Sequence, residues 1–305
     1  MIRRVLIYLH EMFPPFKYIP AALGTFLMYF FSLSRLEGIN QFSIDWSVIT
    51  GALSVILFLI FLRISDELKD YESDKIHFPN RPLQSGRVKK SDLKVLFSGI
   101  IVILIILNFS ISIRFLAFVI LLCYSLLMYK WFFIEEKIKN SLPLALFTHN
   151  PIVFLLLGYI YIIFLETTGG WQNLENPDTT IGMIIPIGLA GTLWEISRKI
   201  KSPDQENDYT TYSKIWGYKK ATLLALICLL ISAILILKYF HIVGANILYI
   251  WGFVLVFIGI SFPYIFFFFT QRIYPIKLKT AAEYYSFLLS ILIIVEAVNY
   301  NLNII

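Results

Sequence analysis

The sequence is poor in charged residues: Asp, Glu, Lys and Arg make up 15% of its 305 residues, whereas a soluble domain of this size carries about a quarter. It also lacks a polar stretch long enough to fold alone, and 58% of its residues are hydrophobic. These scarcities exclude an ordinary soluble protein. Cysteine is equally scarce. Cys123 and Cys228 lie inside apolar segments, which argues against a disulfide framework, and the sequence has no Cys/His spacing typical of a zinc site.

Long apolar segments recur along the chain, and several reach the length of about 18 residues that crosses the hydrocarbon core of a bilayer. We therefore predict an all-α integral membrane protein in which residues 1–305 form a single membrane domain. The N-terminal segment with Arg3 and Arg4 lacks a small-residue cleavage site and is interpreted as interfacial. The pattern predicts nine transmembrane helices, at residues 17–35, 46–64, 95–110, 114–133, 142–165, 180–200, 219–239, 246–269 and 283–303.

Positive charge is distributed unevenly over the segments between these helices. Of the 26 Lys and Arg residues, all except Arg35, Arg114 and Lys238 lie on one side of the predicted bundle. Because such residues accumulate on the cytoplasmic side, we expect the N-terminus inside, the C-terminus outside and the inner membrane of a bacterium as the location. A basic face of this kind suits membrane lipid or an anionic substrate, and we expect no nucleic acid. The sequence identifies no protein partner. The two long, polar loops on this side are residues 63–94 and 198–220.

The first long loop begins with DELKDYESD, which packs five acids into nine residues. Asp66, Asp70 and Asp74 are spaced four residues apart, so on a helix they share one face, with Glu67 at its edge. Three carboxylates at a membrane boundary repel one another and need a compensating positive charge. Two nearby lysines supply it in one interpretation. In the other, the charge is a hard divalent cation such as Mg²⁺, which binds carboxylates together with substrate phosphates.

The next segment, HFPNRPLQSGR at residues 77–87, contains two prolines and a glycine and is predicted to end the helix. It brings Asn80, Arg81 and Arg87 close to the carboxylates. The planar guanidinium group of arginine matches phosphate oxygens, so these residues predict a diphosphate site. In the alternative, the segment is an ordinary loop whose arginines pair with the acids.

The acidic spacing followed by NRPLQSGRV resembles the UbiA superfamily of intramembrane prenyltransferases, whose first motif is usually NDxxDxxxD followed by RPLxxG. The resemblance covers essentially the whole chain, and Asp66 replaces the leading Asn of the motif. It implies nine helices around a central cavity that opens laterally to lipid, with Mg²⁺ holding an isoprenyl diphosphate against two acidic motifs. An allylic cation then develops and is attacked by a lipophilic acceptor, which in this family is most often an aromatic compound or a quinone precursor.

The resemblance also implies roles for individual residues. Tyr124 and Lys130 resemble the family's Y-S-x-x-x-K stretch, whose lysine contacts the diphosphate, although Lys130 is equally explained as an interfacial lysine. The positions carried over as metal-binding and catalytic acids, with Glu67 in support, are Asp66, Asp70 and Asp74.

The second acidic motif departs from the family pattern, which is usually KDxxDxxGD. Here Glu195 is followed by Arg198 and Lys199, and then by Asp204 and Asp208. In one interpretation, Glu195 and one of the two aspartates bind a second Mg²⁺ and take part in catalysis. In the other, Arg198 and Lys199 contact the diphosphate directly and the second metal is weakened or absent. A carboxylate at the end of a membrane helix is costly to bury without a partner, so Glu195 favours a functional site in either case.

Four further polar residues lie in or beside the predicted helices. His149 and Asn150 precede a proline, and they either contact the acceptor or form hydrogen bonds between helices around a kink. Lys17 either reaches the diphosphate or anchors the interface. Glu296 either pairs with an inward-facing group or lies at the outer boundary with Asn299, and we favour the boundary.

Mg²⁺-dependent prenyl transfer is therefore the predicted activity. An intramembrane terpene cyclase of the same fold, in which the cation is quenched internally, is the alternative enzyme. A non-catalytic lipid-binding or transport protein is the alternative outside enzymes. It is disfavoured because a transporter places charges near the bilayer midplane, whereas here they gather at one surface.

Overall fold

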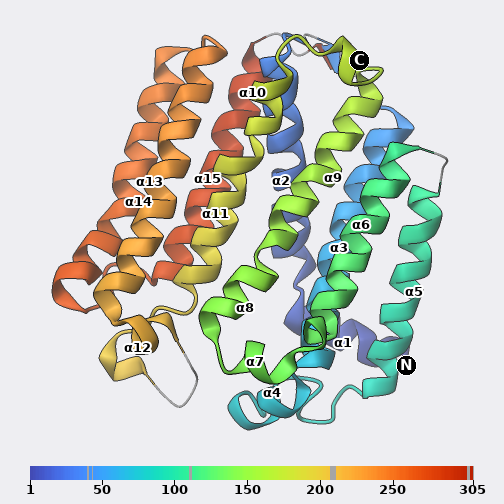
Figure 1. The fold of residues 1–305 in the computed structure, drawn as a ribbon, viewed down its shortest axis with the longest axis vertical. Helices are drawn as coiled ribbons and strands as arrows, with labels where there is room; N and C mark the ends of the chain where they lie inside the picture. Colours follow the sequence, from blue (N-terminus) through green and yellow to red (C-terminus); the bar gives the residue numbers. More distant parts are fainter. Residues whose placement is uncertain (40, 43, 110–111, 207–210, 301–302, 305) are drawn as a thin grey trace.

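The computed structural model describes the whole chain except residues 40, 43, 110–111, 207–210, 301–302 and 305, and the described part is mostly helical (Figure 1). A two-residue parallel pairing joins β1 (Gln41–Phe42) to β2 (Asn303–Ile304). Short 3₁₀ turns lie at Trp131–Phe133, Trp171–Asn173 and Pro203–Gln205. The helices are α1 (Ile2–Met12), α2 (Pro15–Leu36), α3 (Trp46–Lys69), α4 (Tyr71–His77), α5 (Lys90–Asn108), α6 (Ile113–Tyr129), α7 (Glu135–Lys139), α8 (Leu142–His149), α9 (Pro151–Thr167), α10 (Pro177–Gly182), α11 (Ile184–Ser197), α12 (Tyr212–Trp216), α13 (Tyr218–Ile242), α14 (Ile247–Thr270) and α15 (Leu278–Asn299).

The membrane spans lie where the sequence predicts them. In the described residues, eight helical segments are long and apolar enough to cross a bilayer, and two of them are the consecutive pairs α8–α9 and α10–α11. The remaining predicted span, residues 114–133, corresponds to α6, an apolar helix of 17 residues at the short end of the range for a membrane helix. The prediction of an all-α integral membrane protein is confirmed.

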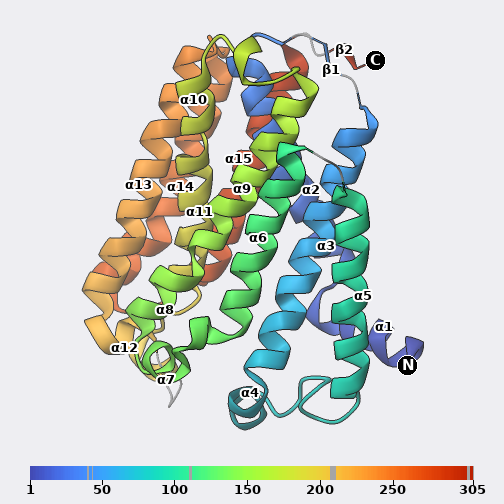
Figure 2. The ribbon, with the colours of Figure 1, turned by 45° about the vertical axis from the view of Figure 1, so that its right-hand side comes forward.

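The two ends of the helix bundle differ in character (Figures 1 and 2). The short helices α4, α7 and α12 lie at one end together with α1 and the N-terminus, and the C-terminus lies at the other. We call the first of these the motif end, because both polar loops lie there. Chain termini at opposite ends are what an odd number of spans requires.

Close helix contacts hold α11 against α9. A Cβ atom added to Gly191 would lie 2.9 Å from the Val153 side chain, and one added to Gly188 would overlap the Phe154 ring. Glycine has no side chain, so it lets two membrane helices approach closely. Close packing of this kind holds helices together in lipid, where the hydrophobic effect does not favour their association. The contact positions the end of α11, which carries the second motif, beside the α8–α9 break.

An ion pair is buried at the end of the bundle opposite the motifs. Arg35 in α2 donates to the carboxylate of Glu296 in α15 over 2.9 Å and to the Val243 carbonyl over 2.8 Å, and the Tyr300 ring covers its guanidinium. Glu296 is 2% exposed. Glu296 therefore pairs with an inward-facing group, the alternative to the boundary position with Asn299 that we favoured, because a buried carboxylate needs a partner and α2 supplies it.

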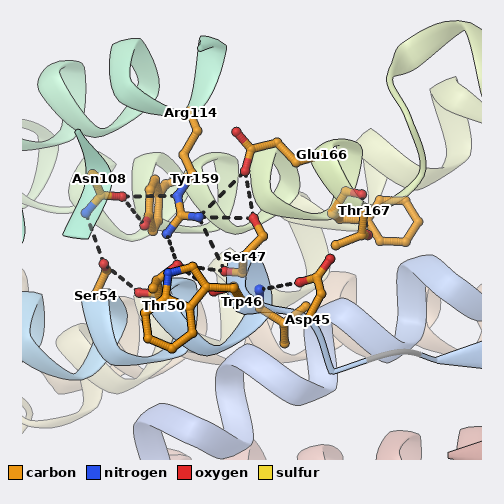
Figure 3. A network of polar contacts seen from close by, with 12 residues as sticks. Asp45, Trp46, Ser47, Thr50, Ser54, Asn108, Arg114, Tyr159, Glu166 and Thr167 are labelled. Atoms are coloured by element: carbon orange, nitrogen blue, oxygen red, sulfur yellow. Dashed lines mark hydrogen bonds and ion pairs between the residues drawn. The ribbon is translucent and has the colours of Figure 1, made fainter. Parts of the chain in front are cut away.

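A second polar network joins α3, α5, α6 and α9 (Figure 3). The buried Arg114 guanidinium donates to the hydroxyls of Ser47 and Thr50 over 3.0 and 2.9 Å and to Asn108 over 3.2 Å. It also lies 3.6 Å from Glu166. Arg35 and Arg114, two of the three cations expected outside, are thus interhelical contacts.

Candidate active site

The first acidic motif begins in the last turn of α3 and continues into α4. Asp70 links the two helices, and the backbone keeps helical spacing: the Asp70 N–H donates to the Asp66 carbonyl and the Asp74 N–H to the Asp70 carbonyl, both over 2.8 Å. The three side chains therefore follow one another along the same side of the chain, as the sequence predicts.

Local cations neutralise two of the three aspartates. Lys69 lies 3.3 Å from Asp66, and Arg81 lies 2.6 Å from Asp74. Asp70 has no ion pair within 4 Å among the residues that the structure describes. Burial, opposed by the charge of Lys69, raises the pKa of Asp70 to about 6. Asp70 is thus a carboxylate whose negative charge is incompletely compensated.

This donor set fits Mg²⁺. In the described part of the chain, no three His, Cys, Asp or Glu side chains converge into a complete metal cage. However, Mg²⁺ typically uses one or two carboxylates, and waters and substrate phosphates complete its octahedron. Asp66, whose side chain is half-exposed, and Asp70 supply oxygen donors of that kind.

Glu67 points elsewhere. Its side chain is buried and pairs with Arg63 over 2.7 Å, and the Gln84 side chain lies beside it. The Tyr8 hydroxyl of α1 bonds to the Arg63 carbonyl on the same side. A metal-supporting role for Glu67 remains a prediction, and its observed contacts are those of a link between α3, α1 and the following loop.

The loop after α4 turns its arginines to different partners. Arg81 pairs with Asp74, whereas Arg87 forms two bonds of 2.5 and 2.9 Å with Glu11 of α1 and donates to the Asn80 carbonyl over 2.9 Å. Both arginines therefore pair with acidic side chains in the structure, as in the second interpretation that the sequence left open.

Lys69 and His149 form a contact that the sequence does not predict. The Lys69 ammonium lies 3.2 Å from Nε2 of His149 and 4.4 Å from the centre of the Trp131 ring. Trp131 and Phe132 both pack edge-on against His149. Asn150 follows at the α8–α9 break and donates to Thr192 of α11 over 2.7 Å, which is the interhelical role considered for it.

The aromatic segment beside His149 has an unusual backbone. Trp131, Phe132 and Phe133 have φ values of 52, 50 and 59°, in the left-handed region that favours glycine. Each bulky residue there costs about 1–2 kcal/mol. Strain of this kind tends to persist where function needs a particular geometry.

The second motif forms a compact charged group at the end of α11. Glu195 accepts two bonds from Arg198, of 2.5 and 2.8 Å, and lies 3.3 Å from Lys199. Burial, opposed by Glu195, lowers the pKa of Lys199, and the negative charge of Asp70 also acts on it. The two motifs therefore share one electrostatic field. Asp204 lies exposed in the turn that follows, and Asp208 lies outside the described residues.

Three further predicted contacts lie around this region. Lys17 is 3.4 Å from Glu283 of α15, which also accepts from the indole of Trp194. Lys130 is exposed and faces the Tyr129 ring. The Tyr124 hydroxyl donates to the Thr148 carbonyl over 2.8 Å and so holds α6 to α8.

An apolar groove of about 590 Å³ begins two residues from His149. It runs between α6, α9 and α11. Tyr124 lines it, and the Tyr124 ring contacts Phe132, which in turn contacts His149. The full lining is Ile120, Cys123, Tyr124, Leu127, Pro151, Phe154, Leu155 and Ile184.

Comparison with known proteins identifies the family. A model of the UbiA prenyltransferase family matches residues 11–292. The chain belongs to the UbiA prenyltransferase family. This UbiA protein is 29% identical over 208 residues to a digeranylgeranylglyceryl phosphate synthase of Methanosphaera stadtmanae, and the alignment covers 65% of the chain and 69% of the relative.

A solved structure, described as giving structural and mechanistic insights into digeranylgeranylglyceryl phosphate synthase in membranes, has the same fold. It matches 97% of this chain and 99% of its own, with a TM-score of 0.65 and 17% identity. The UbiA protein is thus a prenyltransferase in an integral membrane bundle, and the prediction of enzyme class is confirmed.

Proposed function

We propose that this UbiA protein transfers an isoprenyl group from an isoprenyl diphosphate to a lipophilic acceptor in a Mg²⁺-dependent reaction. The observation that carries the proposal is Asp70. Its carboxylate has no ion pair within 4 Å among the described residues, and it lies in the field of Lys69 from one motif and Lys199 from the other. A metal–diphosphate complex would supply the positive charge that Asp70 lacks, and its phosphate oxygens would give Lys69 and Lys199 a second anionic partner beside Asp66 and Glu195.

The residues around this position divide the work. Asp66 and Asp70 would hold the ion, which when bound draws negative charge onto the leaving diphosphate. Lys69, Lys199 and Arg198 would orient the diphosphate and stabilise the charge that gathers on it as the allylic C–O bond breaks. Glu195 would keep Arg198 and Lys199 in place through the ion pairs described above.

We take the acceptor to be a prenylglyceryl phosphate lipid. The relative of Methanosphaera stadtmanae is named for a product of this class, which supports it over the aromatic or quinone-precursor acceptor that is the family's commonest case. The apolar groove beside His149 suits the hydrocarbon chain of such a lipid. The basic motif end faces the cytoplasm in this proposal, where both the diphosphate and the phosphate headgroup would meet positive charge.

The test is a product assay with purified protein in nanodiscs, using isoprenyl diphosphates of several chain lengths. Geranylgeranylglyceryl phosphate and a hydroxybenzoate serve as competing acceptors. Prenylation of the glyceryl phosphate lipid supports the proposal. Prenylation of the hydroxybenzoate alone would show that the acceptor is an aromatic compound and not a glyceryl phosphate lipid. A cyclised hydrocarbon formed without either acceptor would identify a cyclase instead.

A further inference from the structure

His149 stands at the centre of the site without a role in binding metal or diphosphate. It is the last residue of α8, and α9 starts at Pro151 after one intervening residue. The charges that act on it come from two parts of the chain: Lys69 and Asp66 belong to α3, and Lys199 follows the end of α11. The other three histidines belong to other helices: His10 is in α1, His77 is in α4 and His241 is in α13.

The hydrogen bonds of the imidazole fix its tautomer. An ammonium group can only donate, so Nε2 of His149 accepts from Lys69 over 3.2 Å and carries a lone pair. Nδ1 then bears the proton and donates to the Ala145 carbonyl over 3.1 Å. The Thr148 hydroxyl, 3.0 Å from Nδ1, donates its own proton to the Leu144 carbonyl and can accept as well. The imidazole is therefore neutral, with its basic nitrogen turned toward the first motif.

The surroundings keep the ring in this orientation. Trp131 and Phe132 pack edge-on against it with ring centroids 5.5 and 6.0 Å away, and both residues have the left-handed backbone described above. The Trp131 ring also lies under the Lys69 ammonium. His149 thus contacts Lys69 of the first motif on one side, and Phe132 connects it to Tyr124 in the lining of the apolar groove on the other.

Resting on the proposed function, we propose that His149 is the proton acceptor for the hydroxyl group of the acceptor lipid. As the allylic C–O bond of the donor breaks, its electron pair leaves with the diphosphate. A lone pair of the acceptor oxygen forms the new C–O bond, and the O–H proton passes to Nε2 of His149. Lys69 already reaches Asp66 at 3.3 Å on its other side, so it can turn to the diphosphate and uncover Nε2 when the donor binds.

The test compares His149→Gln and His149→Ala with wild-type protein in nanodiscs, using geranylgeranyl diphosphate and geranylgeranylglyceryl phosphate. Gln keeps an acceptor for Lys69 but cannot take a proton. We expect His149→Gln to lower kcat for transfer by about 10²–10⁴-fold, with the donor KM within about threefold of wild type. Release of diphosphate to water in the absence of acceptor should be unchanged, and added imidazole should restore transfer to His149→Ala.

The outcomes separate this role from others. Transfer by His149→Gln within about threefold of wild type overturns it. A parallel loss of donor binding, or of acceptor-independent diphosphate release, assigns His149 a structural role and also overturns it. Wild-type protein that releases diphosphate but prenylates no hydroxyl-bearing acceptor overturns the proposed function, and the role of His149 with it.

Discussion

Lys69 and His149, eighty residues apart in the chain, lie 3.2 Å from each other at the motif end of the bundle. The contact joins the end of α3, which carries the first acidic motif, to the break between α8 and α9. Asn150 continues the connection to Thr192 in α11, the helix that carries the second motif. The residues proposed to bind the diphosphate and the histidine proposed to act on the acceptor are thus connected by hydrogen bonds between helices.

The second motif is predicted to act through its cations. Glu195 already accepts from Arg198 and lies beside Lys199, so its oxygens are committed. Arg198→Gln should raise the donor KM about tenfold, since one charge-assisted contact to diphosphate is lost, and Glu195→Gln should raise it similarly. Neither should change the Mg²⁺ concentration that gives half-maximal activity. A large increase in that concentration for Glu195→Gln would instead show a second metal site.

The apolar groove is predicted to hold the hydrocarbon chain of the acceptor. Cys123→Trp places an indole in a groove of about 590 Å³ and should raise the acceptor KM about tenfold while leaving the donor KM near wild type. Leu116→Trp is the control, because Leu116 lies exposed on the same helix outside the groove. An increase in the donor KM alone would assign the groove to the isoprenyl chain of the donor.

The Arg35–Glu296 pair is predicted to stabilise the bundle without affecting chemistry. Arg35→Met leaves a carboxylate that is 2% exposed without its partner, which costs about 3–5 kcal/mol, so thermal stability in nanodiscs should fall. The double variant with Glu296→Leu should recover most of the loss, because no buried charge remains. A double variant as unstable as the single one would mean that packing, and not the ion pair, matters here.

The attachment of α1 is predicted to depend on pH through Glu11. The hydrogen bond from Arg87 lowers the pKa of Glu11, so the pair stabilises docking above the unfolded pKa of about 4.3 and this contribution disappears as pH falls through the lower, folded value. Both side chains are more than a third exposed, so solvent screens the pair and its contribution to docking is small.

A spin label on Leu6→Cys, in a background without Cys123 and Cys228, measures this docking. Its mobility should rise modestly as pH is lowered below about 4. Arg87→Gln is the matched variant. The mobility of the label should already be higher at neutral pH, and the rise in mobility that protonation of Glu11 causes at low pH should disappear. Equal pH dependence in both proteins would contradict the role of the pair.

Much of the fold follows from patterns local in the sequence. The apolar segments predict the membrane helices. The four-residue spacing of Asp66, Asp70 and Asp74 predicts their arrangement along one side of the chain, because helical backbone hydrogen bonds continue through Asp70. These features depend on length, hydropathy and helical period, which the chain carries residue by residue.

The partners of the charged residues do not follow from such patterns. Arg87 turns to Glu11, Arg35 to Glu296 and Lys69 to His149, each across a long separation that only helix packing can close. The left-handed backbone at residues 131–133 is equally hidden, because that segment contains no glycine to indicate it. For this reason the sequence assigns Arg87 to diphosphate, whereas the structure has it bonded to α1.

Metal-dependent ionisation of the donor is the central claim, and diphosphate release measured with wild-type, Asp70→Asn and Glu72→Gln proteins tests it most directly. Glu72 belongs to the same acidic segment but is largely exposed and lies beside Lys90. With an isoprenyl diphosphate and acceptor, wild type and Glu72→Gln should be active with Mg²⁺ and inactive with EDTA, and Asp70→Asn should lose at least about 100-fold. Release that continues in EDTA, or an Asp70→Asn protein as active as Glu72→Gln, would contradict the account.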